Sequence, residues 1–391
     1  MARKNKIKQN DTRLTKFRVQ NYRGLRDVTF DGLQPLNVII GPNGCGKTTV
    51  LDSISFLSDF FRGNISTALE KHKVSFKNIL SQNSLGGVKY EIVVQTFNRS
   101  GKDTNSSMYE LELIPNGEAK IGLERMVNSF EFAVFERSLS QNFLIYGNEM
   151  PKNFQDLLSA NLANVSMINL TTEFGTYLSP LTKPVTVYTI IPHHVLPSVP
   201  VTSEPVLDSD GKNLADVLLH LQNSHPNCVE KINDILSQWV PTIQSITAVD
   251  SKNGYANLLI KAKGLDEPIL REFVSDGTIK ILALLVLLHA PNPPPLLLIE
   301  EPENFINPRL MRKLSEEFQR ASELSQLIIT SHEPNFLNGL NPDQVWYMNN
   351  DSNGVPKVTR ADQFEKVQFL IEKDEWLGNM WNDGIFGNDG L

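Results

Sequence analysis

Short hydrophobic runs near the start of the chain alternate with polar residues and turn signals. Residues 16–25 and 27–30 alternate like half-exposed β-strands, and residues 36–40, LNVII, form an apolar run typical of a buried central strand. After a glycine-rich turn, apolar side chains recur at helical spacing at Val50, Leu51, Ile54, Leu57, Phe60 and Phe61. This stretch therefore predicts a strand, a loop and a helix in that order.

The pattern weakens between residues 64 and 184. Residues 89–97 and 108–114 look like antiparallel strands and residues 150–165 like a helix, while no heptad repeat persists long enough for a long coiled-coil arm. The proline-rich residues 179–205 then predict an extended connection. We interpret the chain as a core interrupted by an inserted lobe: core residues 1–63, a lobe over residues 64–184, and core residues 185–391.

The last part of the chain alternates helical and strand-like patterns, without an internal repeat. We expect helices over residues 213–224 and 229–240 and a strand over residues 255–263. Buried strands follow in PPLLLIEE and LIITSH, ending in acids and in a histidine, and QVWYM closes the sheet. The helix between the first two has Pro308 suited to its first turn and apolar or small residues at Leu310, Leu314, Phe318, Ala321 and Leu324.

Composition is that of a soluble globular protein with one large domain or two moderate ones. The chain has 391 residues, of which 40% are hydrophobic and 21% charged. Its net charge of -7 argues against a surface covered with nucleic-acid contacts. One basic stretch has two interpretations, a solvated terminus or a contact with nucleic acid or a partner, and consists of Arg3, Lys4, Lys6, Lys8, Arg13, Lys16 and Arg18.

The two cysteines, Cys45 and Cys228, allow no disulfide framework and show no zinc-ligand spacing. The N-terminus is charged where a signal peptide would be apolar, and no apolar run is long enough to span a bilayer. We therefore expect a cytoplasmic protein without a membrane role of its own.

The segment GPNGCGKT matches the pattern G-x-x-x-x-G-K-[ST], in which backbone N–H groups wrap around phosphates. Its place between a buried strand and a helix strengthens the match. Lys47 would neutralise the β- and γ-phosphates, and Thr48 would hold Mg²⁺. We expect ATP to be bound by Gly41, Asn43, Gly44, Gly46, Lys47, Thr48 and Thr49.

Two further sites lie at the ends of the later strands. Glu300, directly after the apolar run 296–299, is placed to reach Mg²⁺, and Glu301 to polarise an attacking water. His332 could hydrogen-bond a γ-phosphate or that water. The adjacent His193 and His194 have no other ligand at metal spacing.

A second helix start that could bind an anion lies in FVSDGTIK. Ser275, Asp276 and Gly277 are placed where the free N–H groups of the following apolar helix point outward. Because the chain already has a phosphate loop, this second start raises the question of whose phosphate it binds.

The order of these motifs resembles that of the ABC-type ATPase heads of the RecF, Rad50, SMC and OLD group, and more closely that of the AAA_21 class of ATPases found in prokaryotic defence systems. The resemblance extends from FRVQNYRGL through GKNLADVLLHL to WLGNMWNDGIFG and is weakest over residues 64–184. It implies an α/β fold, a P-loop NTPase core of ABC-ATPase head type with a mixed central sheet flanked by helices, an antiparallel β lobe and a helical insertion.

In heads of this type, two protomers sandwich ATP between the phosphate loop of one and the signature turn of the other. The resemblance implies these roles by matching motif: signature in trans for Ser275, Asp276 and Gly277, Walker B acid for Glu300, catalytic acid for Glu301, and switch histidine for His332.

The resemblance also makes Arg23, in NYRGLRD, a candidate nucleotide contact. The glutamine that reaches Mg²⁺ from the second lobe would be Gln82 or Gln95. One turn departs from the expected pattern: ENGLHP is common after the acids, whereas this chain has ENFINP with Phe305, Ile306 and Asn307. That departure bears on the coupling between the two sites and on the hydrolysis rate.

The resemblance implies an ATP-hydrolysing homodimer, or a higher homo-oligomer, that switches a separate nuclease or toxin effector in antiphage defence. The alternative is a RecF- or Rad50-like ATPase of DNA repair or chromosome maintenance, with DNA as a partner, which only the basic N-terminus supports directly. A transporter subunit is disfavoured because the signature reads SDGT rather than SGGQ. A scaffold that hydrolyses slowly or not at all is the remaining alternative.

Overall fold

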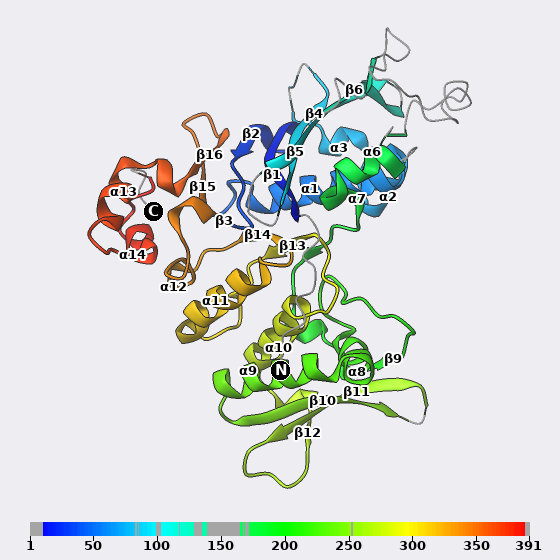
Figure 1. Ribbon diagram of the computed structural model, residues 1–391, viewed down its shortest axis with the longest axis vertical. Coiled ribbons are helices and arrows are strands. Elements are labelled where there is room, and N and C mark those ends of the chain that lie inside the picture. The colour runs from blue at the N-terminus through cyan, green and yellow to red at the C-terminus, as the bar shows by residue number, and fades with distance from the viewer. Residues whose placement is uncertain are drawn as a thin grey trace. The chain divides into compact units, whose positions relative to one another are not determined.

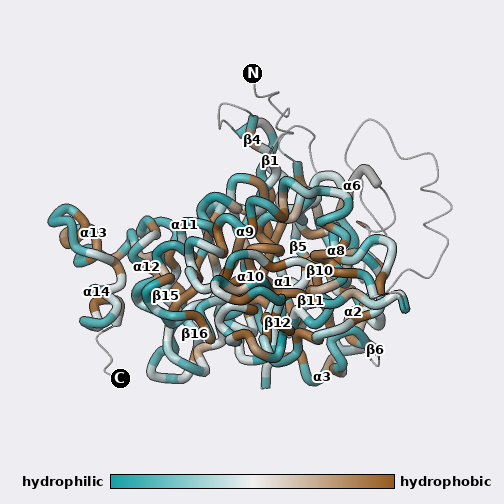
Figure 2. The backbone as a smooth tube through the Cα atoms, turned by 90° about the horizontal axis from the view of Figure 1, so that it is seen from below, coloured by the Kyte–Doolittle hydropathy of each residue, from teal (hydrophilic) through white to brown (hydrophobic). Residues whose placement is uncertain are grey.

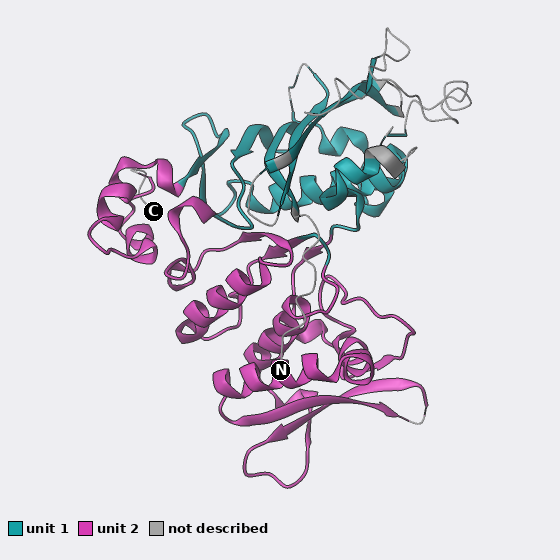
Figure 3. Ribbon diagram, viewed as in Figure 1, with its two compact units in different colours: residues 1–185, 294–296, 346–360 teal, residues 186–293, 297–345, 361–391 magenta. Residues whose placement is uncertain are grey.

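The computed structural model describes residues 11–387 except residues 83, 85, 99–102, 117, 129–134, 139–164, 167, 169–171 and 252 (Figure 1). The chain divides into two compact units (Figure 3). Unit 1 comprises residues 1–185, 294–296 and 346–360, and unit 2 comprises residues 186–293, 297–345 and 361–391. Unit 1 includes both the expected first core segment and the expected lobe, so the division at residues 63 and 64 stays a prediction.

Unit 1 contains a large antiparallel sheet and a smaller group of strands, with helices packed beside them. The large sheet has the strand order β2-β1-β4-β5-β6-β7, and β3, β15 and β16 are neighbours in the order β16-β15-β3. The elements are β1 (Asp11–Tyr22), β2 (Leu25–Asp31), β3 (Leu36–Ile40), α1 (Lys47–Arg62), α2 (Ile65–Lys71), α3 (Phe76–Ile79), β4 (Val88–Phe97), β5 (Asp103–Asn116), β6 (Glu118–Asn128), β7 (Phe135–Ser138), α6 (Thr172–Tyr177), α7 (Ser179–Thr182), β15 (Val345–Asn350) and β16 (Pro356–Arg360).

Aromatic side chains join α1 to the large sheet. The rings of Phe56 on α1 and Tyr22 on β1 lie 5.8 Å apart, and those of Phe61 and Tyr109 meet edge to face at 5.1 Å. Such pairs add to the hydrophobic stabilisation of burial. The helix that follows the phosphate loop is therefore fixed on the sheet along its length.

Unit 2 contains a second antiparallel sheet, in which β11 pairs with β9, β10 and β12, and strands adjacent in the order β14-β13-β8. Its elements are β8 (Val187–Tyr188), β9 (Ser198–Pro200), α8 (Leu214–Ser224), α9 (Pro226–Trp239), β10 (Ile243–Ser251), β11 (Tyr255–Ala262), β12 (Ile269–Leu270), α10 (Asp276–Leu288), β13 (Leu296–Glu300), α11 (Met311–Ala321), β14 (Gln326–Thr330), α12 (Pro334–Leu337), α13 (Glu365–Ile371) and α14 (Leu377–Asn382).

Helices α8 and α9 cover one face of the second sheet (Figure 1). Polar side chains on these helices bond the backbone of β10: Asn233 contacts Ile246, and Gln222 contacts Ala248. Figure 2 shows α10 as mostly hydrophobic, and every residue of it from Thr278 to Leu288 is buried, whereas α11 is largely hydrophilic. In the described part of the chain, no helix combines the length and the apolarity needed to cross a membrane.

Most strands and helices expected from periodicity are confirmed, with corrections at their ends. Helix α11 ends at Ala321, so Leu324 lies beyond it and is 68% exposed, and Pro308 lies in a 3-10 turn before the helix. Strand β14 ends at Thr330, two residues before His332, whereas Glu300 is the last residue of β13 rather than the first past it. The helix expected over residues 150–165 lies outside the described residues for all but its last position.

Candidate functional site

The predicted phosphate loop of unit 1 connects β3 directly to α1. Gly46, the residue before the helix, is left-handed with φ 105°, and no side chain caps the helix start. The first N–H groups of a helix have no partner within the helix and carry partial positive charge. The start of α1 thus has the geometry of an anion-binding site.

Two glycines of this loop are needed for different reasons. A Cβ atom on Gly41 would lie 1.8 Å from the carbonyl oxygen of Met348 on β15, which no real structure tolerates. Gly44 has open space around it but adopts φ 78°. Gly41 therefore permits close packing of two chain segments, and Gly44 permits a left-handed turn.

The lysine of the loop folds back onto the loop itself. The Lys47 Nζ atom donates hydrogen bonds to the carbonyl oxygens of Gly41 at 2.9 Å and Pro42 at 3.0 Å, and the residue is only 6% exposed. Asn43 and Thr48 are exposed and Thr49 is half-buried. The ammonium group of Lys47 is thereby held over the loop, where the oxygens of a bound phosphate would take the place of these two carbonyl oxygens as hydrogen-bond acceptors.

Arg23 lies in the turn between β1 and β2 and belongs to a charged cluster. Its Nη1 atom is 3.1 Å from Asp52 Oδ2, an oxygen that also accepts a hydrogen bond from Tyr22 Oη at 2.6 Å. The imidazole of His72 belongs to the same cluster: its Nδ1 atom is 2.9 Å from Asp52 Oδ1, and its Nε2 atom is 3.2 Å from Asp59 Oδ2. Burial alone would lower the pKa of His72, but the hydrogen bonds to the two carboxylates raise it to about 9.

The structure separates the two candidate glutamines. Gln82 is exposed and directly follows Ser81, whose backbone N–H donates to the Asn21 carbonyl at 2.9 Å, so Gln82 is near the turn that holds Arg23. The Gln95 side chain instead bonds Asp103 at 3.0 Å, where β4 pairs with β5. Gln82 is thus the glutamine better placed for a nucleotide site, and its role stays a prediction.

The acids of unit 2 lie at the end of β13. The carboxylate of Glu300 accepts a hydrogen bond from the Thr189 hydroxyl at 3.0 Å. Glu301 has φ 42°, and its N–H donates to the Thr330 carbonyl at 3.0 Å. A non-glycine residue with positive φ is a strained conformation that often marks a functional site.

Glu301 and His332 lie close together, although their catalytic roles stay predictions. The Glu301 Oε1 atom is 3.4 Å from His332 Nε2, and Asn304 donates a hydrogen bond of 2.7 Å to Glu301 Oε2. Glu303, which the motif analysis did not assign a role, accepts from the backbone N–H of His332 at 2.6 Å and from Ser331 at 2.9 Å. Burial raises the pKa of Glu303. In the sequence, only its place as the third acid of EEPEN pointed to Glu303.

The signature turn of unit 2 is the expected helix start. Ser275 caps α10, its hydroxyl accepting from the Thr278 N–H at 3.3 Å. The Asp276 carboxylate is held by Arg271 and by His193, each at 3.2 Å. Ser275, Asp276, Arg271 and His193 line an open hollow of about 470 Å³. The other residues that line it are Val195, Pro197, Glu272 and Val274.

Lys280, one turn into α10, was not singled out from the sequence. It is 2% exposed, and its Nζ atom donates to the carbonyl oxygens of Ile190 at 2.8 Å and Glu301 at 3.4 Å. Burial lowers the pKa of this ammonium to about 8, although nearby carboxylates oppose the shift. The FVSDGTIK segment therefore contains a buried cation besides its helix start.

The oxygen-rich donor set suits Mg²⁺, which prefers carboxylates, hydroxyls and phosphate oxygens. Within the described ranges, no group of three or more His, Cys, Asp or Glu side chains could hold a metal ion by itself. The candidates are Thr48 in unit 1 and Glu300 in unit 2.

Two family models match separate parts of the chain. The model described as "AAA domain, putative AbiEii toxin, Type IV TA system", AAA_21, matches residues 235–338, which include the signature turn, the acids and His332. The model described as "AAA domain", AAA_23, matches residues 16–169, which include Arg23 and the phosphate loop. Each site assigned from the motifs thus lies within a matched segment.

Two RecF proteins match a short stretch of this chain. The DNA replication and repair protein RecF of Acinetobacter baumannii strain ATCC 17978 is 44% identical over 45 residues, which are 12% of this chain and 12% of RecF. The chain thus spans about an eighth of that relative's length. A second match, to RecF of Francisella tularensis subsp. mediasiatica strain FSC147, is also 44% identical over 45 residues, 12% of this chain and 13% of that protein.

The fold is that of solved SMC heads. An SMC head bound to the C-terminal winged-helix domain of ScpA superposes with a TM-score of 0.56 at 13% identity, covering 88% of this chain and 97% of that one. The Pyrococcus furiosus SMC head with an extended coiled coil, bound to the C-terminal domain of ScpA, gives a TM-score of 0.55 at 12% identity, covering 93% of this chain and 100% of that one. At such low identity these likenesses establish the fold alone.

Proposed function

The chain is an ABC-type ATPase of the RecF, Rad50 and SMC group, and on this premise we propose that it hydrolyses Mg²⁺-bound ATP as a sandwich dimer that switches a separate effector. The phosphate loop supports the first part. An uncapped helix start, a left-handed glycine before it and a buried lysine folded over the loop are what a nucleotide's phosphates require.

We assign each step of the chemistry to the residues whose motifs predict it. Lys47 and the loop N–H groups would hold the β- and γ-phosphates, while Thr48, Glu300 and Gln82 would hold Mg²⁺, which neutralises charge between those phosphates when bound. Glu301 would orient the attacking water and accept its proton. His332, paired with Glu301 at 3.4 Å, would sense the γ-phosphate.

The dimer explains the second helix start. The open hollow beside Ser275 and Asp276 leaves the start of α10 accessible to an anion. We propose that this anion is the γ-phosphate of ATP bound to the loop of a second copy, so that each site needs residues from two chains.

Two variants test the proposal. Lys47→Ala should reduce ATP turnover by at least about a hundredfold, since it removes a charge that acts on the transferring phosphoryl group. Glu301→Gln should bind ATP without hydrolysing it and so accumulate as a dimer or higher oligomer, seen as a mass shift by light scattering after size exclusion and absent with ADP. Unchanged turnover in Lys47→Ala would contradict the enzymatic proposal.

A separate effector is supported by two likenesses. One matched family model names a toxin–antitoxin system, and the SMC heads of like fold were solved bound to a ScpA domain. We therefore propose a nuclease or toxin as the partner, with antiphage defence as the setting. Purification of Glu301→Gln from its native cell with ATP should capture that partner, and its identity tests the proposal.

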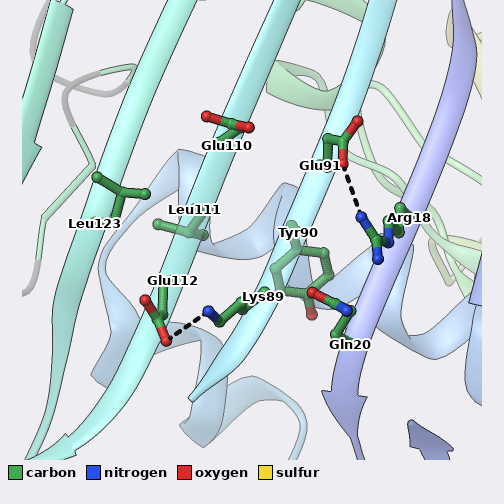
Figure 4. A pocket seen from close by; sticks show the side chains of 9 residues that line it. All are labelled: Arg18, Gln20, Lys89, Tyr90, Glu91, Glu110, Leu111, Glu112 and Leu123. Atoms are coloured by element: carbon green, nitrogen blue, oxygen red, sulfur yellow. Dashed lines mark hydrogen bonds and ion pairs between the residues drawn. The ribbon is translucent and has the colours of Figure 1, made fainter. Parts of the chain in front are cut away.

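A RecF-like role in DNA repair is the second candidate, favoured by the RecF matches. Two of the described basic residues near the N-terminus give it little support, because acids pair with them: Lys16 lies 2.5 Å from Glu91, and Arg18 lies 2.8 Å from Asp27 (Figure 4 shows Arg18 beside Glu91). The same sheet face carries a Lys89–Glu112 pair at 3.3 Å. Binding to duplex ends that weakens steeply with salt would favour this role over the effector switch.

A further inference from the structure

Helix α10 contacts the turn that follows β13 at two points. A Cβ atom on Gly277 would lie 2.5 Å from the Phe305 carbonyl oxygen, so this glycine packs directly against the turn. Three residues later, the Lys280 ammonium donates to the Glu301 carbonyl at 3.4 Å. Because positions three apart share a helix face, one face of α10 supports both ends of the turn.

The turn between these contacts is strained at both ends. Glu301 has φ 42° and Phe305 has φ 71°, both in the left-handed region that non-glycine residues rarely adopt. Such conformations persist only where the surroundings enforce them. The two contacts from α10 are part of that enforcement.

The backbone of Glu301 is held on both sides. Its N–H donates to the Thr330 carbonyl at 3.0 Å, and its own carbonyl accepts from Lys280. The shorter bond from Lys280 to the Ile190 carbonyl, 2.8 Å, anchors the ammonium at a third segment. A buried cation is costly unless it is bonded, so its presence here needs a reason that an apolar residue would not satisfy.

We propose that Lys280 is a positioning residue that couples the signature turn of one copy to the catalytic Glu301 of that same copy. In the sandwich, Ser275–Gly277 binds the nucleotide of the neighbouring copy, whereas Glu301 acts on the nucleotide of its own. Lys280 therefore links the two nucleotide sites of the dimer: phosphate bound at the start of α10 fixes the helix, and the helix fixes the Glu301 backbone. The inference rests on the proposed function.

Lys280→Met tests this coupling, because methionine keeps much of the side-chain length and removes the donors. We expect kcat to fall about tenfold or more, as small displacements of a catalytic group cost rates of this order. ATP binding to the phosphate loop of unit 1 should not change, and the ATP dependence of the rate should lose its cooperativity. Lys261→Met, at an exposed position of β11, is the matched control.

The conservative variant distinguishes positioning from simple structural support. Lys280→Arg keeps charge and donors and should recover part of the lost kcat and the cooperativity. If circular dichroism shows that Lys280→Met does not fold, Lys280→Gln, which retains two N–H donors, replaces it. Its kcat and KM for ATP are then measured beside those of the wild type. A lower kcat at unchanged KM supports the coupling.

Failure of the coupling differs from failure of the proposed function. A folded Lys280→Met protein with wild-type kcat and cooperativity overturns the coupling alone, as does a loss of ATP binding as large as the loss of kcat. If the wild-type chain and Lys261→Met do not hydrolyse ATP, the proposed function fails and the coupling falls with it.

Discussion

The starts of α1 and α10 offer the same helix-terminal chemistry with very different support. The start of α1 has no side-chain cap, and the Lys47 ammonium donates to carbonyl oxygens of its own loop. The start of α10 is capped by Ser275, flanked by an Asp276 that Arg271 and His193 hold, and backed by the Phe305 carbonyl. The lysine of the first site thus bonds within its own loop, whereas the second helix start is held by side chains outside it.

This difference implies different roles for the two anion sites. At the first site, the Lys47 ammonium can exchange loop carbonyl acceptors for phosphate oxygens. A helix start packed against the turn that holds Glu301 cannot change without affecting that turn. We infer that the first site supplies affinity for nucleotide, whereas the second converts occupancy into a change at the catalytic acid.

The largest expected effect is in the loop of unit 1. Gly41→Ala would place a Cβ atom 1.8 Å from the Met348 carbonyl, so β3 and β15 cannot keep their present packing. We expect a loss of about 4 kcal/mol or more in the free energy of unfolding, in the range reserved for backbone clashes and buried strain. Urea denaturation followed by circular dichroism measures it.

Gly44→Ala is the matched control in the same loop. Its φ of 78° is unfavourable for alanine, but a Cβ atom there meets nothing within 4 Å. The expected cost is about 1 to 2 kcal/mol, that of a left-handed non-glycine residue. Equal losses for both variants would show that backbone conformation, and not the contact with Met348, determines the need for glycine at residue 41.

The second prediction addresses the helix start of unit 2. In Gly277→Ala the new Cβ atom would lie 2.5 Å from the Phe305 carbonyl and push the turn away from α10. We expect kcat for ATP to fall about a hundredfold, because a displaced catalytic group costs rates of this order. ATP binding by equilibrium dialysis should stay at the wild-type level, since the phosphate loop is in unit 1.

A glycine turn elsewhere in unit 2 controls for general destabilisation. Gly254→Ala, between β10 and β11, changes a left-handed residue with φ 76° and open space around it. It should lower stability slightly and leave kcat unchanged. If Gly277→Ala loses ATP binding together with turnover, the two helix starts are not functionally distinct, and the comparison drawn above is wrong.

The sequence was sufficient for features that depend on local pattern. LNVII predicted β3 to the residue, and the motif GPNGCGKT predicted a loop between a strand and a helix. Strands β6 and β7 were not predicted, because their buried positions include the polar or charged residues Glu124, Asn128 and Arg137. Strand β10 was not predicted either, because a register shift after Ile243 breaks the alternation of its buried positions. The antiparallel pairing of β4 and β5 was predicted, but their continuation of the β1 sheet was not, since pairing partners far apart leave no local signal.

Residues whose role depends on distant neighbours escaped sequence reasoning. Lys280 looks like an ordinary polar break in an apolar helix until the Ile190 carbonyl, 90 residues earlier, is placed beside it. His72 gave no signal, because its two carboxylate partners lie on α1 and become neighbours only when α2 folds back. Burial and long-range contact determine these roles, and neither is readable from spacing.

The third prediction concerns pH and unit 1. His72 is held between Asp52 and Asp59, with Tyr22, Arg23 and Lys71 bonded to the same carboxylates. Its pKa is about 9 when folded and about 6.5 when unfolded, so folding binds a proton between these values. The stabilisation is complete below pH 6.5 and is lost as pH rises through 9, by on the order of 3 kcal/mol.

His72→Gln isolates this contribution. Glutamine keeps a hydrogen-bonding side chain and does not titrate, so the variant should be less stable at pH 6 and should show a flatter decline in unfolding free energy between pH 6.5 and pH 9. Urea denaturation of both proteins at pH 6, 7.5 and 9 measures the difference. Parallel pH profiles would mean that the charge of His72 does not stabilise unit 1.

The smallest expected effect tests how far the held turn of unit 2 depends on its side chains. Asn304 is exposed and donates a 2.7 Å hydrogen bond to Glu301 Oε2, whereas the backbone of Glu301 is held by Thr330 and Lys280. An exposed polar contact contributes about 0.5 kcal/mol, so Asn304→Ala should lower kcat only two- to threefold. Asn379→Ala, which removes an exposed bond between an asparagine on α14 and a nearby glutamate, should leave kcat unchanged. If Asn304→Ala lowers kcat as much as Lys280→Met does, then the position of Glu301 depends on the hydrogen bond to its side chain rather than on the bonds to its backbone.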